Sequence, residues 1–272
     1  MSAPGVPGVA VAGGTGAGPA LVGYDADHER GVAVLTLDSV ANRNALSSPL
    51  LDQLAALLRR AAADDAVRVV VLRANGPSFC SGADLAAVRS GAMTPIVEGV
   101  VEVQRLIVTM PKPVVARVHG TVRAGGLGLV AAADIAVGAL ESSYALTEVR
   151  LGLAAAAVSL TVLPRLGDRA AADYLLTGRV FGGAEAERAG LLTRAVPEAE
   201  LDTAVDAYLE DLLLGTPQGL REAKALLTAP MRARMDEFGQ EMVDLSARLF
   251  ASAEAGRAIE ALLSGIRRSR GA

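Results

Sequence analysis

The chain has no tryptophan, a single cysteine and only two histidines, and these absences narrow what it can be. Its 272 residues are 51% hydrophobic but only 3% aromatic. Because Cys80 stands alone, no disulfide can form within the chain, which is typical of a protein from a reducing compartment. His28, His119 and Cys80 have neither the number nor the spacing of a four-ligand zinc site. The composition therefore excludes a disulfide scaffold and a zinc finger, and we expect no metal.

The charge balance and the apolar runs exclude two further kinds of partner. A formal net charge of −4 offers no concentrated basic surface for nucleic acid. Residues 1–20 lack the basic start and the continuous apolar stretch of a signal peptide. The longest apolar run, 127–140, is interrupted by Asp134 and is too short to span a bilayer. We therefore expect a cytoplasmic protein that binds neither nucleic acid nor membrane.

The sequence divides into three regions. Residues 1–20 are rich in glycine, proline and alanine, which predicts a disordered tail. Residues 21–200 alternate short apolar runs with long helical patterns, which indicates an α/β core with crossover connections. Residues 201–272 show helical spacing without a clear strand. We expect this last region to pack on the core or on a neighbouring subunit.

Local patterns locate the main elements of the core. Apolar runs predict strands at 32–37, 67–72, 113–118 and 134–137. Ser48 is expected to cap a helix that has Pro49 in its first turn and extends to about Ala63. The run 127–133 predicts a buried helix. Thr216-Pro217 marks a break, and the apolar spacing over 220–227 and 242–263 predicts further helix after it.

Three separated segments carry the most specific pattern in the chain. They read SFCSGADL at 78–85, RAGGLGL at 123–129 and LTEVRLGL at 146–153. Their order and spacing resemble the enoyl-CoA hydratase/isomerase (crotonase) family, and the resemblance covers about residues 24–200. It implies an α/β fold with a crotonase-like ββα spiral core and a C-terminal helical oligomerisation region. It also implies a homotrimer, or a hexamer made of two trimers.

The resemblance assigns the catalytic groups. In this family two backbone N–H groups hold the carbonyl of an acyl-CoA thioester and stabilise the negative charge of an enolate-like transition state, at about 3 kcal/mol per donor. By resemblance these donors belong to Ala83 and Gly125, and Glu148 is the acid/base. Gly125 and Gly126 let the backbone approach a ligand without a Cβ in the way. The apolar neighbours of Glu148 are expected to bury its carboxyl and raise its pKa.

The resemblance also implies how coenzyme A is held, as part of the substrate and with no separate cofactor. The implied substrate-binding residues are Asn44, Ala45 and Leu46 of the family's N-A-L motif, Ala83, Asp84 and Leu85 after the first donor, and Gly125, Gly126 and Gly128. Asp84 equally fits a first-turn acid of the next helix. Lys224 is a candidate for a CoA phosphate, although an exposed lysine on a solvated face is commoner. His119 is expected to form structural hydrogen bonds.

Gly128 decides the type of reaction. The best-known hydratases of the family have a second glutamate there, which helps to activate one water. Double-bond isomerisation needs only one base. The sequence around Gly128 nevertheless resembles a bacterial subgroup that also has glycine here and is usually named enoyl-CoA hydratase, methylglutaconyl types included. We therefore predict an enoyl-CoA hydratase, a hydro-lyase, with a Δ3,Δ2-enoyl-CoA isomerase as the alternative.

Two further interpretations assign no chemistry. The missing glutamate at Gly128 also fits a non-catalytic acyl-CoA-binding homologue. Taken without the family pattern, Glu148 fits a structural ion pair with Arg123 or Arg150.

Overall fold

The computed structural model describes residues 19–84 and 93–270, with side chains as far as 265. The tail expected at the N-terminus lies almost wholly outside these ranges, as does the predicted binding residue Leu85.

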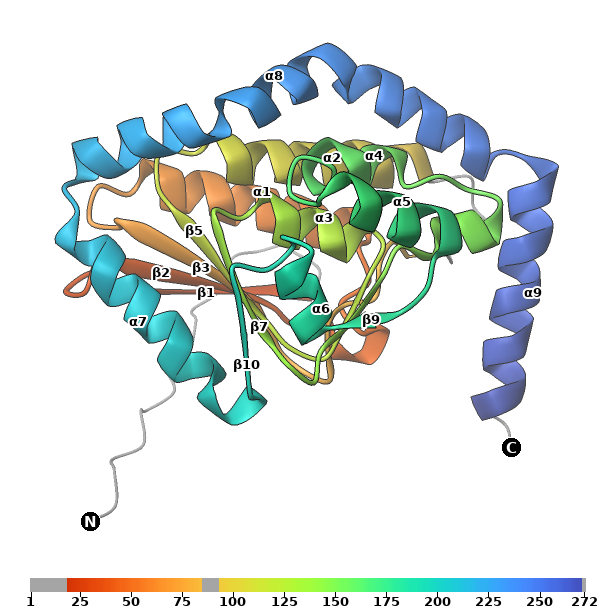
Figure 1. Ribbon diagram of the computed structural model, residues 1–272, viewed down its shortest axis with the longest axis horizontal. Helices are drawn as coiled ribbons and strands as arrows, with labels where there is room; N and C mark the ends of the chain where they lie inside the picture. The colour runs from red at the N-terminus through yellow and green to blue at the C-terminus, as the bar shows by residue number, and fades with distance from the viewer. Residues whose placement is uncertain (1–18, 85–92, 271–272) are drawn as a thin grey trace.

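A large sheet forms the centre of the molecule (Figure 1). Its six strands, in spatial order, are β1 (Val22–Asp27), β2 (Val32–Leu37), β3 (Val69–Ala74), β5 (Val114–Val118), β7 (Ile135–Ala139) and β10 (Arg194–Val196). β1 is antiparallel to β2, and every later pair of neighbours is parallel. The predicted strand 32–37 coincides with β2. The other three predicted strands correspond to β3, β5 and β7, and their ends differ from the observed ends by at most two residues.

A second, smaller sheet was not predicted from the sequence. It orders β4 (Ser78–Cys80), β6 (Thr121–Arg123), β8 (Ser143–Ala145) and β9 (Phe181–Gly182). β3, β5 and β7 of the large sheet are each followed in the chain by a strand of the small sheet, and β6 leads directly into a helix. This repeated strand–strand–helix path confirms the expected ββα spiral core.

Helices surround the two sheets. Within the described ranges they are α1 (Ser48–Ala63), α2 (Met93–Thr109), α3 (Gly125–Ala132), α4 (Ala156–Val162), α5 (Asp168–Thr177), α6 (Gly183–Arg188), α7 (Leu201–Leu214), α8 (Pro217–Phe250) and α9 (Ala253–Arg270), with 3₁₀ turns η1 (Val40–Asn42), η3 (Thr147–Leu151) and η4 (Glu198–Glu200). No helix of the described chain combines the length and apolar character needed to cross a membrane.

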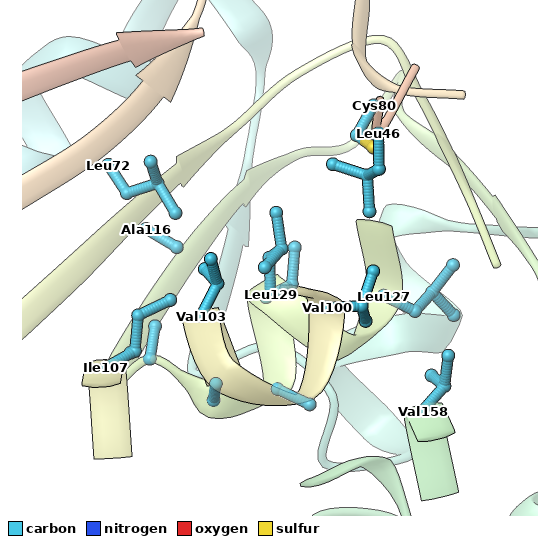
Figure 2. Packing of buried hydrophobic residues seen from close by; sticks show 14 of the residues in the cluster. Leu46, Leu72, Cys80, Val100, Val103, Ile107, Ala116, Leu127, Leu129 and Val158 are labelled. Atoms are coloured by element: carbon cyan, nitrogen blue, oxygen red, sulfur yellow. The ribbon is translucent and has the colours of Figure 1, made fainter. Parts of the chain in front are cut away.

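Both faces of the large sheet are covered along β2, β3, β5 and β7, which explains the nearly continuous apolar character of these strands. On one face Val69 and Val137 pack against Val205 and Leu209 of α7. On the other face lies the main core, where α1, α2 and α3 meet the sheet. Figure 2 shows this core from close by, with side chains of α2 beside those of α3. Each fully buried aliphatic side chain contributes roughly 1.5–3 kcal/mol, so this core accounts for most of the stabilisation.

Two predicted helix boundaries need correction. Helix α1 begins one residue earlier than the pattern indicated: Ser48 is its first helical residue, and Ser47 occupies the N-cap position with extended backbone and no side-chain capping bond. The spacing over 242–263 spans two helices, since α8 ends at Phe250 and α9 begins at Ala253. The break at Thr216-Pro217 is confirmed: the Thr216 hydroxyl accepts a hydrogen bond from the N–H of Gly219 at 3.2 Å, at the start of α8.

The C-terminal helices complete the enclosure of the core. α8 runs across the molecule over α2 and α4 (Figure 1). α9 turns back against η3, where Ala255 and Ile259 pack on Leu153. The two helices therefore close one side of the region that contains Glu148.

Candidate active site

A cavity of about 410 Å³ lies where α2, α3, η3 and α4 meet, with α8 and α9 along its edge. Its volume is in the range of small-molecule sites. Its wall is mostly apolar, with Val97 and Val100 from α2 and Val158 from α4. Phe250 and Leu262 bring the C-terminal helices to it. Ala83, Gly125 and Glu148, the three predicted catalytic residues, all line this one cavity.

The segment around Ala83 presents a backbone N–H to the cavity. Leu46 pairs with Ala83 in an isolated parallel bridge, in which the N–H of Leu46 donates to the carbonyl of Gly82 at 2.8 Å and the N–H of Asp84 donates to the carbonyl of Leu46 at 3.0 Å. Backbone groups alternate in direction along extended chain, so the N–H of Ala83 points away from Leu46. It is therefore available to a ligand.

The second predicted donor stands at the start of α3. Gly125 is the first residue of this wholly buried helix, so its N–H has no partner within the helix. Ala124 before it has a φ of 47°, and its N–H donates to the carbonyl of Ala145 at 3.1 Å. This strained residue turns the chain from β6 into α3. The positive end of the α3 dipole consequently faces the cavity.

Two glycines allow the donor segments to touch. Gly82 has a φ of +92°, and a Cβ built on it would lie 3.1 Å from the Cβ of Ala124 and 3.3 Å from the carbonyl oxygen of Arg123. A Cβ on Gly126 would lie 2.8 Å from that of Cys80. Larger residues would separate the two segments. The glycines thus hold the N–H groups of Ala83 and Gly125 in one cavity, which is the arrangement an oxyanion site requires.

Glu148 is the predicted acid/base. It lies in η3 and is 8% exposed, and its Oε2 has no hydrogen-bond partner among the described residues. Burial raises the pKa of this carboxyl from 4.5 to about 7. A carboxyl with such a pKa exchanges a proton readily near neutral pH. The prediction that its apolar surroundings would bury it is confirmed.

The alternative of a structural ion pair for Glu148 is not supported. Arg123 donates to the carbonyls of Val122 at 2.8 Å and Ser143 at 2.7 Å. Arg150 donates to the carbonyl of Thr177 at 3.1 Å. Over the described ranges neither arginine forms a salt bridge with Glu148. The carboxyl therefore remains available for proton transfer.

Gly128 does not line the cavity. A Cβ at this position would lie 3.1 Å from Cδ and Nε2 of Gln104, so the amide of Gln104 fills the space beside it. Gln104 is fully buried, and its Oε1 accepts a hydrogen bond from the hydroxyl of Thr161 at 2.7 Å. Sequence reasoning missed this buried polar pair. A glutamine among the valines of an amphipathic helix was the only signal that could have indicated it.

The N-A-L motif supports the site from behind. Asn44 is fully buried; its Oδ1 accepts from the N–H of Ser39 at 2.8 Å, and its Nδ2 donates to the carbonyls of Asn75 at 2.9 Å and Ser78 at 2.8 Å. Neither Asn44, Ala45 nor Leu46 lines the cavity. The bonds of Asn44 hold the loop that leads into β4. The structure therefore gives this motif a part in fixing the position of the Gly82-Ala83 segment.

The suggestion that Lys224 binds a CoA phosphate is wrong. Its Nζ is buried and forms a salt bridge of 2.8 Å with Asp134, and it donates to the carbonyls of Ile107 at 2.7 Å and Lys112 at 2.9 Å. Three donors of an ammonium are thus used inside the protein. The helical pattern of α8 could not reveal that this position faces the core.

The predictions for His119 and Asp84 have different outcomes. His119 forms hydrogen bonds through both ring nitrogens, to the carbonyl of Gly76 at 2.7 Å and to Arg117 at 3.3 Å, as expected for a structural histidine. Asp84 lies directly after the first donor but does not line the cavity. Its side chain is 3.5 Å from the amide nitrogen of Asn42.

Known proteins share both the sequence and the fold. The model of the family described as enoyl-CoA hydratase/isomerase matches residues 27–265. A Thermus thermophilus protein assigned provisionally as an enoyl-CoA hydratase is 38% identical over 204 residues, which cover 73% of this chain and 81% of that protein. The mitochondrial methylglutaconyl-CoA hydratase of Mus musculus is 31% identical over 215 residues, covering 75% of this chain and 68% of the relative.

A solved structure extends the similarity to three dimensions. The crystal structure of an enoyl-CoA hydratase from Mycobacterium avium has a TM-score of 0.84 and 46% sequence identity to this chain, covering 91% of this chain and 97% of the other. The similarity includes the C-terminal helices, since it extends over nearly the whole described chain.

Proposed function

Because the chain belongs to the enoyl-CoA hydratase/isomerase family, we propose that it hydrates the double bond of an enoyl-CoA thioester with Glu148 as its single acid/base. One observation carries this proposal. The buried carboxyl of Glu148 has an oxygen without a hydrogen-bond partner, and it lines the same cavity as Ala83 and Gly125. The relatives named as hydratases support hydration rather than isomerisation.

The mechanism follows from these groups. The thioester carbonyl oxygen accepts hydrogen bonds from the N–H groups of Ala83 and Gly125. The carboxylate of Glu148 takes a proton from water while the water oxygen bonds to Cβ, and the electrons of the double bond move into an enolate. Glu148 then returns that proton to Cα. The product is a 3-hydroxyacyl-CoA, and the carboxylate of Glu148 is restored.

Isomerisation is the second candidate function, and one observation favours it. Glu148 is the only carboxylate among the described residues that line the cavity. Moving a double bond from position 3 to position 2 requires one base, which removes a proton from Cα and returns it to Cγ. The same enolate and the same two N–H donors serve this reaction.

Two substrates and one substitution test the proposal. Crotonyl-CoA should lose its conjugated absorbance and yield 3-hydroxybutyryl-CoA, whereas an isomerase would instead generate absorbance from 3-hexenoyl-CoA.

Glu148→Gln should lower either turnover by roughly 10²-fold or more while leaving thioester binding intact. Glu141→Gln alters an exposed glutamate outside the cavity and serves as the control. Unchanged turnover in Glu148→Gln would remove this residue from the mechanism. Saturable binding of acyl-CoA without any turnover by the native protein would favour the non-catalytic homologue.

We also propose that the chain assembles in the cytoplasm as a homotrimer or as a hexamer of two trimers. Three large apolar side chains near the start of the C-terminal region support an intersubunit surface: Leu214 is 86% exposed, Leu226 78% and Leu227 79%. Burying such side chains against another subunit is favourable. Light scattering at micromolar concentration should give three or six times the chain mass of 27.7 kDa. A monomer would contradict this assembly.

A further inference from the structure

Ser246 is a buried serine that lines the cavity from α8. It is 5% exposed, and its neighbours on the same face of the helix are Val243, which belongs to the main core, and Phe250, which also lines the cavity. Residues three and four positions apart share one face of a helix. Ser246 therefore faces the inside of the molecule rather than the solvent around it.

The hydroxyl of Ser246 has no hydrogen-bond partner among the described residues. A hydroxyl within a helix commonly donates to the carbonyl four residues earlier, as Thr228 of the same helix does to Lys224 at 2.8 Å. The partnerless side-chain oxygens that are sealed from solvent do not include Oγ of Ser246, so this oxygen borders open space. The cavity is the open space along this residue. Only a molecule inside the cavity can therefore pair with the hydroxyl.

Helix α8 brings Ser246 to the side of the cavity that lies away from the catalytic groups. α8 packs mainly on α2 and α4 (Figure 1), whereas η3, which carries Glu148, packs mainly on α5 and α9. α3, which begins at Gly125, packs on α2 and α4 rather than on α8. An acyl chain whose thioester is held at Ala83 and Gly125 therefore reaches Ser246 with its distal part.

The wall on this side of the cavity carries no charge. Within the described chain, α2 contributes an isoleucine and two valines to it, α4 two alanines and a valine, and α9 a leucine. Ser246 has the one polar side chain among the lining residues of these helices and α8. An ionised group here would lose its hydration without gaining a counter-ion. A neutral oxygen, in contrast, is satisfied by a single hydrogen bond.

We propose that Ser246 selects an enoyl-CoA whose acyl chain carries an uncharged oxygen, a hydroxyl or a carbonyl, beyond the double bond. The inference rests on the proposed function for the position of the thioester. A hydrogen bond between Oγ and this oxygen satisfies both groups, whereas a plain alkyl chain leaves the buried hydroxyl without a partner, and a site of this kind rejects the apolar analogue. Ser246 determines specificity and takes no part in proton transfer.

Pairs of substrates with equal shape test the proposal. In 6-hydroxyhex-2-enoyl-CoA the chain ends in a hydroxyl, and in hept-2-enoyl-CoA a methyl group replaces it; shorter and longer pairs extend the series. Every hydroxylated chain loses hydration on binding, so the comparison is made between lengths. At one length the ratio of kcat/KM for the hydroxylated and alkyl substrates should exceed one and be about tenfold higher than at the other lengths. A ratio that is the same at every length would show that water satisfies Oγ equally well, and would overturn the proposal.

Substitution then tests the residue itself. Ser246→Ala should lower the ratio at that length about tenfold and change kcat/KM for the alkyl substrate by less than about twofold, whereas Ser246→Thr keeps a hydroxyl and should keep the preference. Ser159→Ala is the matched control, since Ser159 is also buried but donates to the carbonyl of Ala156 at 2.7 Å and does not line the cavity. An equal loss on both substrates in Ser246→Ala would give Ser246 a structural role and contradict the proposal.

A binding measurement separates this inference from the proposed reaction. The saturated thioesters 6-hydroxyhexanoyl-CoA and heptanoyl-CoA, with their shorter and longer counterparts, cannot be hydrated, and calorimetry gives their dissociation constants directly. A binding ratio that peaks at one length and falls in Ser246→Ala, without hydration of the enoyl forms, would support the oxygen site and contradict hydration. Hydration of the enoyl forms with a binding ratio independent of length would do the reverse.

Discussion

Helix α3 begins at the cavity that contains Glu148 and ends, at Ala132, beside the carboxylate of Asp134. At its C-terminal end every charge has a partner. Asp134 accepts from the N–H of Val114 at 2.7 Å and pairs with Lys224 at 2.8 Å, while Arg165 donates to the last carbonyls of the helix. At its N-terminal end, within the described part of the chain, the N–H groups of Ala83 and Gly125 donate no hydrogen bond to the backbone, and Oε2 of Glu148 has no partner.

The polar groups around the two ends of α3 therefore differ in how fully they are hydrogen-bonded. Buried polar groups are normally hydrogen-bonded, so an unsatisfied carboxyl costs stability. At Glu148 burial raises the pKa of the carboxyl to about 7, which suits proton transfer. Proteins keep such costly groups mainly at functional sites. The following predictions change in turn the partner of Asp134, the carboxyl of Glu148 and the middle of α3 at Gly128.

Lys224→Met should have the largest effect on stability. The substitution leaves the half-buried carboxylate of Asp134 without its ammonium partner, and breaking a buried ion pair typically costs about 3–5 kcal/mol. Urea unfolding measures this loss. The double variant Lys224→Met/Asp134→Asn should recover part of it, because the amide oxygen still accepts from Val114. KM for crotonyl-CoA should not change in the folded fraction of either variant. A raised KM without loss of stability would restore Lys224 as a CoA ligand.

Glu148→Gln should do the opposite and stabilise the protein at high pH. Burial raises the pKa of Glu148 from 4.5 to about 7, so below pH 4.5 the carboxyl is protonated in both folded and unfolded chains and costs little. As pH rises to 7 and beyond, the folded state becomes progressively destabilised, by at most about 3 kcal/mol. The neutral amide avoids this cost. Urea unfolding should therefore show a gain for Glu148→Gln at pH 8 that largely disappears at pH 5; an equal difference at both pH values would contradict an unpaired carboxyl.

Gly128→Glu should have a smaller effect, which depends on Gln104. A Cβ at position 128 would press on the Gln104 amide at 3.1 Å, so the single variant should lose roughly 1–3 kcal/mol through overpacking. Gly128→Glu/Gln104→Ala provides room for the new carboxylate. We expect its ratio of crotonyl-CoA hydration to 3-hexenoyl-CoA isomerisation to rise about tenfold over that of Gln104→Ala alone. An unchanged ratio in the folded double variant would show that position 128 does not reach the reacting carbons.

The sequence was sufficient to predict the strands and site residues that short motifs and hydrophobic periodicity determine. Continuous apolar runs located β2 and β3, because both faces of these strands are buried. The glycines around Ala83 and Gly125 indicated the donor segments, since only glycine permits the close approach of Gly82 to Ala124. The burial of Glu148 followed from its apolar neighbours along the chain.

What the sequence could not give were contacts between distant segments. Strands of two or three residues, such as β9, are too short to produce a period. The depth of Lys224 in the core depends on how α8 lies across α2, and the amide of Gln104 meets Gly128 only because α2 packs on α3. Such tertiary contacts leave no local pattern in the chain.

The pH dependence of kcat/KM for crotonyl-CoA tests the central claim most directly, because it reports the ionisation of the catalytic group in the free enzyme. Glu148 must be ionised to take a proton from water, so kcat/KM should be constant above pH 8 and fall as pH decreases, with a midpoint near 7, the pKa to which burial raises Glu148. In Glu148→Gln the residual activity should lack this limb. A native profile without a limb near pH 7, or the same limb in Glu148→Gln, would contradict the account.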